Sequence, residues 1–231
     1  MKTTILISVL VIGLMTVLFS TNISPGGMEL PKGWFKAGDK PESYEMGVVK
    51  MPSCDFTKDQ KLIIQKNDLI VNPMTGGKVA TIKSTDKKID GFGTLMQNCK
   101  PGNYLGNRVR MSGCMKTENV SDWAGLWFRV DGTSVRDFLA FDNMHDGKKN
   151  RSVKGTHDWE KYEIVLDVPA GATNLAYGAL LGGTGQIWFD HITFEIVDNS
   201  VPTTGYTQKE TNEKAPERWG NDEPTNLDFE K

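Results

Sequence analysis

Short stretches in which apolar and polar residues alternate run from Met28 to about Asp198, and Gly, Asn, Asp and Pro residues separate them. Alternation with a period of two is typical of half-buried β-strands, and helical periodicity is nearly absent. The pattern predicts nine strands, namely Tyr44–Val49, Lys78–Ser84, Gly93–Asn98, Arg108–Thr117, Trp123–Val130, Phe138–Met144, Trp159–Val168, Asn174–Leu181 and Ile187–Val197. Nine short strands with turn residues between them indicate an all-β, two-sheet antiparallel sandwich that covers residues 28–198.

The stretch 123–130 has two unlike faces. Successive side chains of a strand point to opposite sides, so every second residue belongs to the same face. One face is smooth and apolar, with Ala124, Leu126, Phe128 and Val130. The other face carries two indoles and a guanidinium, on Trp123, Trp127 and Arg129. A strand face with two indoles and a guanidinium is unusual if that face contacts only water.

Two segments depart from the strand pattern. Residues 54–71 fit it poorly and suggest an inserted hairpin or a short helix. Residues 199–231 are polar with few aliphatic side chains, so we expect a mostly disordered tail. The end of that tail, 226–230 (NLDFE), alternates again and could add a strand to a sheet edge.

The first 27 residues read as a targeting segment. Lys2 precedes an apolar run, 5–19, which Pro25 soon follows. This run of fifteen residues, interrupted only by Ser8, Gly13 and Thr16, is short for crossing a bilayer and suits the central region of a signal peptide. No A-x-A-like cleavage site is present, so an uncleaved N-terminal anchor remains the alternative. Either reading predicts export, with the protein secreted, periplasmic or membrane-anchored.

Composition and charge narrow the function classes. The 231 residues include 27 basic and 29 acidic side chains, which gives a net charge of −2. The chain therefore lacks the basic excess that binding to nucleic acid or anionic lipid would require. The 24 glycines, six tryptophans and ten phenylalanines favour strands and tight turns over a helical bundle. We therefore expect one β-rich domain that does not read nucleic acid.

The exported part contains three cysteines, Cys54, Cys99 and Cys114. An oxidising compartment permits one disulfide and leaves one thiol. Cys54 and Cys99 both border loop-like stretches, which favours a Cys54–Cys99 bridge; three unpaired, buried thiols are the alternative. No C-x-x-C is present and the three histidines are scattered, so the spacing gives no support for a zinc site.

Motifs for catalysis are lacking. The sequence contains no G-x-S-x-G and no H-E-x-x-H, and the glycines of 182–186 precede a strand instead of a helix. A hydrolase could use Asp142, with Asp146, His145 and Asp131 nearby, but acidic residues at strand ends are usually solvated turn formers. We expect a protein that binds without catalysing a reaction.

Carbohydrate is the ligand that the unusual strand face suggests. Sugars pack their C–H faces on aromatic rings and offer hydroxyls to planar polar groups. The candidate ligand-binding residues are Trp123, Trp127, Arg129, Asp142 and Trp188. Two alternatives stay open: Trp127 and Trp188 are sheet-packing residues, or the domain is an envelope structural or protein-interaction domain.

Several phrases resemble the β-jelly-roll, galactose-binding-like modules of the carbohydrate-binding type, and are similar to a family of secreted bacterial proteins without an assigned activity. The phrases include WAGLWFRVDG (123–132), LAFDNM (139–144) and the closing strand GTGQIWFDHITFE (183–195). The resemblance covers about residues 31–198 and implies fold more than function.

The resemblance also implies a metal and a place for the tail. Such modules often hold a structural Ca²⁺ between the Glu of an opening strand and the Asp of the closing strand. The opening strand is missing from its usual place near Leu30, whereas 226–230 has its pattern, so the matching residues are Glu230 and Asp190. His191 stands where an Asp is frequent, which weakens the site. We expect Leu227 and Phe229 to be buried against the sandwich.

Overall fold

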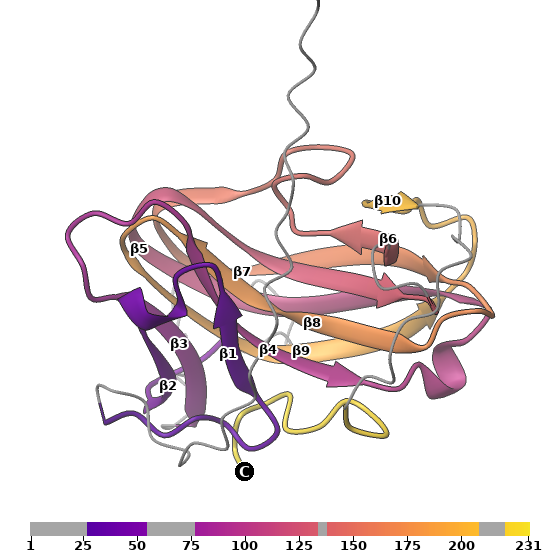
Figure 1. The fold of residues 1–231 in the computed structure, drawn as a ribbon, viewed down its shortest axis with the longest axis horizontal. Helices are drawn as coiled ribbons and strands as arrows, with labels where there is room; N and C mark the ends of the chain where they lie inside the picture. The colour runs from indigo at the N-terminus through magenta and orange to yellow at the C-terminus, as the bar shows by residue number, and fades with distance from the viewer. Residues whose placement is uncertain (1–26, 55–76, 134–137, 208–219) are drawn as a thin grey trace, which may run out of the picture.

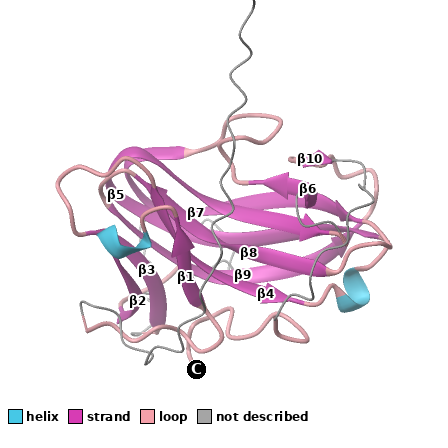
Figure 2. Cartoon of the chain, viewed as in Figure 1, coloured by secondary structure: helices cyan, strands magenta, loops and turns pink. Residues whose placement is uncertain are grey.

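The computed structural model describes residues 27–54, 77–133, 138–207 and 220–231 as an antiparallel all-β structure (Figure 1). Strands make up most of this part, with two short 3-10 helices, η1 (Pro41–Ser43) and η3 (Gly102–Tyr104), as Figure 2 shows. The strands are β1 (Phe35–Gly38), β2 (Tyr44–Lys50), β3 (Lys78–Ser84), β4 (Phe92–Cys99), β5 (Asn107–Asp131), β6 (Phe138–Asp142), β7 (Val153–Val168), β8 (Asn174–Gly182), β9 (Gln186–Val197) and β10 (Tyr206–Thr207). The all-β, antiparallel prediction is confirmed.

The strand β5 belongs to two half-sheets. Its second part, 123–131, lies between β8 and β6, and continues the order β1-β4-β8-β5-β6-β10, which we call the first half-sheet. Its first part, 107–118, lies between β9 and β7 and completes the order β2-β3-β9-β5-β7, the second half-sheet. The two half-sheets are therefore one continuous hydrogen-bonded network that folds over a shared core.

The sequence predicted two strands where the structure has the single strand β5. No Gly or Pro interrupts residues 118–122 (ENVSD), so the chain bends without ending the ladder. The bend coincides with register shifts against β7 between Met115 and Ala124, and Asn119 takes a left-handed φ of 51°. Asn tolerates that conformation better than most residues, which allows the turn in direction.

The core lies between the half-sheets and follows the predicted alternation. The four residues of the smooth face of 123–130 are fully buried and belong to one large hydrophobic cluster; they are Ala124, Leu126, Phe128 and Val130. The same cluster takes Val109, Met111 and Met115 from the first part of β5. The faces of this strand were therefore predicted correctly from the sequence.

The final segment, 220–231, packs against the sandwich but forms turns instead of the expected edge strand. Phe229 is fully buried, with its ring centroid 5.0 Å from that of Trp34 and 5.2 Å from that of Phe189. The Trp34 indole N–H donates to the carbonyl of Asn226 at 3.2 Å. Asn226 and Phe229 take positive φ angles of 50° and 57°, which an extended strand cannot include. The expected burial of Phe229 is confirmed, and Leu227 is partly buried against the core.

Part of the expected tail is structured, and other expectations lie outside the described residues. Residues 199–207 run beside the sandwich: β10 pairs with β6, and the Arg108 guanidinium donates to the carbonyls of Asn199 and Val201. The targeting segment and nearly all of the 54–71 insertion fall outside the described residues. Among the described residues, no helix is long and apolar enough to span a membrane.

Candidate functional site

Aromatic side chains gather on the outer side of the first half-sheet. Directly paired residues of neighbouring strands share a side of the sheet, so the register places them in rows. One row joins Phe35, Met96, Gly178 and Trp127 across β1, β4, β8 and β5. The rows beside it carry the other rings. Together Phe35, Phe92, Trp123, Trp127 and Phe141 form what we call the aromatic face; Met96, Ala176 and Leu180 pack among them.

Trp127 is the buried base of the aromatic face. Its side chain is 6% exposed, and its indole N–H donates to Thr94 Oγ1 at 2.8 Å. Thr94 is on β4, so the indole reaches across β8, where Gly178 is its register partner. A Cβ at Gly178 would collide with the backbone of Leu95 and Met96, so the absence of a side chain there keeps the strands close.

Trp123 stands at one end of the aromatic face and is partly exposed. The His145 ring stacks on it, with centroids 4.7 Å apart and planes inclined by 30°. His145 Nδ1 lies 2.8 Å from Asp146 Oδ1, and Asn143 Oδ1 accepts the backbone N–H groups of His145 and Asp146. Burial acts to raise the pKa of Asp146, but the hydrogen bonds from Asn143 and His145 outweigh it and lower that pKa. This loop therefore holds an imidazole beside an indole.

The opposite end of the aromatic face is polar. Arg129 Nε lies 2.8 Å from Asp131 Oδ1, and the Asn174 amide donates to Asp131 Oδ2 at 2.8 Å. The carboxylate of Asp131 is nearly inaccessible, whereas a third of the Arg129 side chain remains exposed. The Arg129 guanidinium is thus held by the buried Asp131 carboxylate and remains partly accessible to solvent. Across β8 from Arg129 lies Asn98, whose buried Oδ1 has no hydrogen-bond partner in the described part of the chain.

The structure brings together three of the five predicted ligand-binding residues: Trp123, Trp127 and Arg129. Asp142 pairs with the inward-facing Phe128, and is fully buried. Its carboxylate accepts hydrogen bonds from Arg151 at 2.6 Å and from the Met144 N–H at 2.7 Å. Asp142 is therefore excluded from the aromatic face by its register against β5, which the sequence does not specify.

Trp188 lies on the other side of the molecule. It is on β9, paired with Thr81 and Lys116, and so belongs to the outer side of the second half-sheet. The sequence showed that its strand alternates but gave no information on which half-sheet would receive that strand. The sequence did not identify Phe35, Phe92 and Phe141 as members of the site. Phe35 and Phe92 lie outside the predicted strands. Phe141 belongs to the aromatic face because it pairs with Arg129, a contact that the sequence does not reveal.

The two carboxylates suggested for a metal have separate partners. Asp190 is buried, and its Oδ1 accepts the His191 N–H at 2.7 Å while its Oδ2 lies 2.9 Å from His191 Nδ1. Glu230 is exposed, and its Oε1 accepts the Lys78 N–H at 2.8 Å. Neither belongs to a group of three or more metal-ligating side chains in the described ranges.

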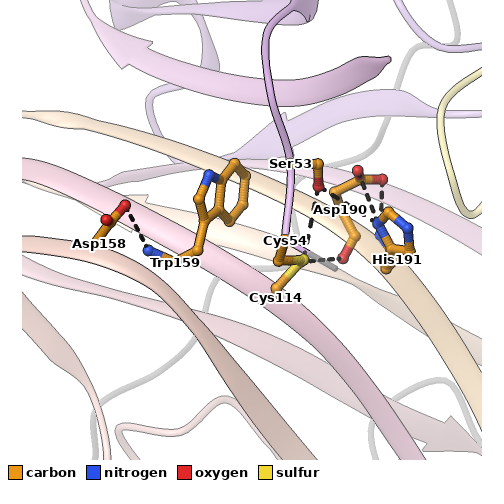
Figure 3. The surroundings of a disulfide bond; sticks show 7 residues. All are labelled: Ser53, Cys54, Cys114, Asp158, Trp159, Asp190 and His191. Atoms are coloured by element: carbon orange, nitrogen blue, oxygen red, sulfur yellow. Dashed lines mark hydrogen bonds and ion pairs between the residues drawn. A yellow bond between two sulfur atoms is a disulfide. The ribbon is translucent and has the colours of Figure 1, made fainter. Parts of the chain in front are cut away.

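The disulfide joins Cys54 to Cys114, with their Cα atoms 6.5 Å apart, so the predicted Cys54–Cys99 pairing is wrong (Figure 3). Residues 51–54 cross the outer side of β5, where Cys114 points outward from its strand. Cys99 instead ends β4 on the core side and is a buried free thiol. Burial raises the pKa of the Cys99 thiol to about 12.

A hollow of about 580 Å³ opens elsewhere, at one end of the sandwich. Tyr104, Phe194, Ile196 and Leu227 supply its apolar lining, and Asp222 pairs with Lys100 at 2.7 Å on its rim. Its volume suits a small ligand. The lining of the hollow includes only two aromatic rings, Tyr104 and Phe194, whereas the aromatic face combines five rings with a guanidinium that Asp131 holds in place. We therefore take the aromatic face as the candidate site.

No family model matches the chain. A relative from Bacillus subtilis (strain 168), named "Uncharacterized HTH-type transcriptional regulator YbfP", is 39% identical over 200 residues, which is 86% of this chain. The chain spans 57% of the length of that relative.

Three solved structures are distantly similar to the chain. One is the CBM22-1 xylan-binding domain from Paenibacillus barcinonensis Xyn10C, with 15% identity, a TM-score of 0.44, and coverage of 73% of this chain and 88% of that one. Another is TmCBM61 in complex with β-1,4-galactotriose, with 13% identity, a TM-score of 0.41, and coverage of 73% and 91%. The third is the enzymatically active domain of Bacteriophage CBA120 tailspike protein 4, with 12% identity, a TM-score of 0.45, and coverage of 72% and 20%.

Proposed function

We propose that this jelly-roll-type sandwich is a non-catalytic carbohydrate-binding module whose ligand lies on the aromatic face. The observation that carries the proposal is the gathering of five aromatic rings on the outer side of one half-sheet, with an anchored guanidinium at its end. Rings offer flat apolar surface to the C–H faces of pyranoses, and a fixed guanidinium donates to hydroxyls without losing much conformational freedom.

The shape of the face suits a chain of several sugars better than a single one. Five strands from β1 to β6 lie side by side at about 4.8 Å each, so the face is about 19 Å wide. Partly exposed rings on Trp123, Phe92 and Phe35 would make the direct contacts, with Trp127 beneath them.

The hydrolase alternative depended on Asp142, and its geometry argues against that role. A carboxylate that is fully buried and hydrogen-bonded to Arg151 and to a backbone N–H is not placed to meet a substrate. Its arrangement is that of a structural ion pair, whose loss would destabilise the fold.

The test compares two tryptophans on opposite outer faces. The full chain would be run through native gels containing xylan, galactan or β-glucan, and the affinity for the retarding polymer measured by titration calorimetry. Trp123→Ala should weaken binding by at least about tenfold, as expected of an aromatic hot spot. The matched control is Trp188→Ala, which removes the same side chain from the second half-sheet and should leave the affinity unchanged.

Two results would count against the proposal. Equal weakening by both substitutions would mean that the aromatic face is not the site. Absence of binding to any saccharide would favour the alternative of an envelope structural or protein-interaction domain.

A second candidate function is ligand sensing for a regulator, which the 39% identity to a named HTH-type regulator favours. The described part of this chain contains no α-helix, and hence none of the helix pairs that read DNA in helix-turn-helix proteins lies within that part. On this reading the domain recognises a soluble effector. A sensor should bind short oligosaccharides as tightly as polymers, whereas a module that attaches a protein to polysaccharide should prefer the polymer.

The proposal includes export. The Cys54–Cys114 disulfide supports it, because disulfides persist mainly in oxidising compartments. Fractionation of expressing cells should place the full chain outside the cytoplasm, and deletion of residues 1–27 should retain it inside. An unchanged distribution after that deletion would contradict the expected role of the segment.

A further inference from the structure

Three residues distant in sequence converge beside the disulfide. One ligand atom each from Cys54, Cys114 and His191 lies within 4.8 Å of the others, which makes this the single such group of three in the described ranges. Figure 3 shows the two cysteines meeting with Asp190 and His191 on one side. Two thiolates and an imidazole are the ligand set that Zn²⁺ prefers.

The backbone of β9 aims His191 at this point. Between Ser112 and Cys114 the register of β5 against β9 shifts, so that β9 carries one extra residue, and His191 takes a left-handed φ of 53°. Bulges of this kind redirect a side chain out of the ordinary alternation. The Asp190 carboxylate, 2.9 Å from His191 Nδ1, then orients the imidazole. Histidines that bind a metal through one ring nitrogen usually donate the other N–H to a carboxylate, so with Asp190 on Nδ1 the metal would take His191 Nε2.

The mobility needed for a metal falls on one ligand. In a tetrahedral zinc site the two sulfurs lie about 3.8 Å apart, farther than in a disulfide. Cys114 is held in β5 between β7 and β9, and His191 is held in β9. Cys54 lies in the stretch 51–54, outside any strand, so no ladder hydrogen bonds fix its backbone as they fix that of Cys114, and the adjustment that a metal requires falls on Cys54.

We propose that Cys54, Cys114 and His191 form a zinc site when the disulfide is reduced, so that disulfide and metal are alternative links between residues 51–54 and the second half-sheet. A phosphine reductant breaks the S–S bond, with the phosphine and one water becoming the phosphine oxide and both sulfurs taking up protons. Zn²⁺ then binds the two sulfurs and the imidazole and releases two protons. Asp190 acts as the positioning residue for His191. The inference is independent of the proposed carbohydrate function.

The test uses the full chain, oxidised or reduced with a phosphine under argon, and Co²⁺ as a spectroscopic probe that Zn²⁺ then displaces. The reduced chain should bind one Co²⁺ with a thiolate-to-metal charge-transfer band, and the oxidised chain should bind none. Cys99→Ala is the control, because it removes the other cysteine and should leave the band unchanged. Cys114→Ser and Cys54→Ser should each abolish the band.

Histidine and its partner give the finer readout. His191→Asn, which tolerates the left-handed backbone, should weaken Zn²⁺ binding by at least about tenfold and shift the Co²⁺ spectrum. Asp190→Asn should weaken it by about 10- to 100-fold while retaining the charge-transfer band. A reduced chain that binds no Co²⁺, an oxidised chain that binds equally, or full affinity in both the Cys54→Ser and His191→Asn variants would overturn the proposal. Far-ultraviolet circular dichroism would verify that each variant is folded.

Discussion

The two outer faces of this sandwich come from the same alternating strands, yet they carry opposite chemistry. On the second half-sheet, charged residues of neighbouring strands pair: Arg108 with Asp167 at 2.7 Å, Arg110 with Glu195 at 3.0 Å, and Lys116 with Asp158 at 2.7 Å. On the first half-sheet, the corresponding positions hold rings and small residues. A sheet face that meets water is expected to be polar, as these ion pairs make much of the second half-sheet, although Trp188 and residues 51–54 also lie on its outer side.

The difference teaches where the candidate site is. Contiguous apolar side chains on an outer face weaken solubility unless something binds there, so their concentration on one half-sheet supports the proposal that the ligand lies on this face. The strand β5 contributes to both faces, with Arg110 on one and Trp127 on the other. The local sequence of each part of β5, rather than the fold, therefore determines the chemistry of each face.

The largest effect on the free energy of unfolding is expected in the core, which serves as the reference for substitutions on the two outer faces. Phe229→Ala should lower the free energy of unfolding by about 3–5 kcal/mol, because it empties a fully buried aromatic site between Trp34 and Phe189. The matched variant Phe35→Ala, on the aromatic face, should cost only about 1–2 kcal/mol because its ring is already partly exposed. Urea denaturation measures both. Similar losses of unfolding free energy in the two variants would mean that Phe35 is a core residue and does not belong to the aromatic face.

Trp127 tests the boundary between packing and binding. Trp127→Ala should lower the free energy of unfolding by about 3 kcal/mol, because the indole is buried, and should also weaken saccharide binding. Thr94→Val removes the hydroxyl that accepts the indole N–H and donates to the Ala179 carbonyl, and should cost about 1–2 kcal/mol. Chemical denaturation and calorimetry on the same samples separate the two effects. A stability loss without any change in affinity would make Trp127 purely structural.

Alkaline pH should weaken the interior through Cys99. The ordinary pKa of this thiol is 9.0 and its native pKa is about 12, so between these values the unfolded chain loses a proton that the native chain keeps. Stability contributed by the thiol is therefore complete below about pH 9 and falls as pH rises, by at most about 1.4 kcal/mol per pH unit. The measurement is the unfolding free energy against pH for the wild type and Cys99→Ala. Identical slopes would show that the thiol ionises in the native state.

The smallest effect is expected on the polar face. Arg110→Gln should change the free energy of unfolding by less than about 1 kcal/mol, because pairs with Glu163 and Glu195 near the surface are screened by water and salt. The difference from the wild type should shrink further in high salt. A salt-independent loss of several kcal/mol would mean that this face is as essential to the fold as the core.

The sequence predicted the fold class and much of the core because both depend on local alternation. Ala124, Leu126, Phe128 and Val130 all face inward as the period of two required. It also predicted burial of Phe229, although not the turn that achieves it. The continuous strand β5 was missed because residues 118–122 are polar but contain no obligatory chain breaker.

Features that depend on which strands become neighbours could not be predicted. Strand order separates Trp188 from Trp127, and it brings Phe35 on β1 beside Met96 on β4. The Cys54–Cys114 pairing follows from the path of residues 51–54 over β5. The position of His191 follows from a β-bulge in β9 that the local sequence does not predict. Spacing along the chain carries no information on such contacts.

The central claim, that ligand binds on the aromatic face, is tested most directly by the indole N–H signals of the ¹⁵N-labelled full chain during a saccharide titration. Alanine or phenylalanine substitutions at single tryptophans would assign the signals. The indole signals of Trp123 and Trp127 should shift in a saturable way, while those of Trp188 and the core residue Trp34 stay in place. Saturable shifts confined to Trp188 would contradict the account and place the ligand on the opposite face.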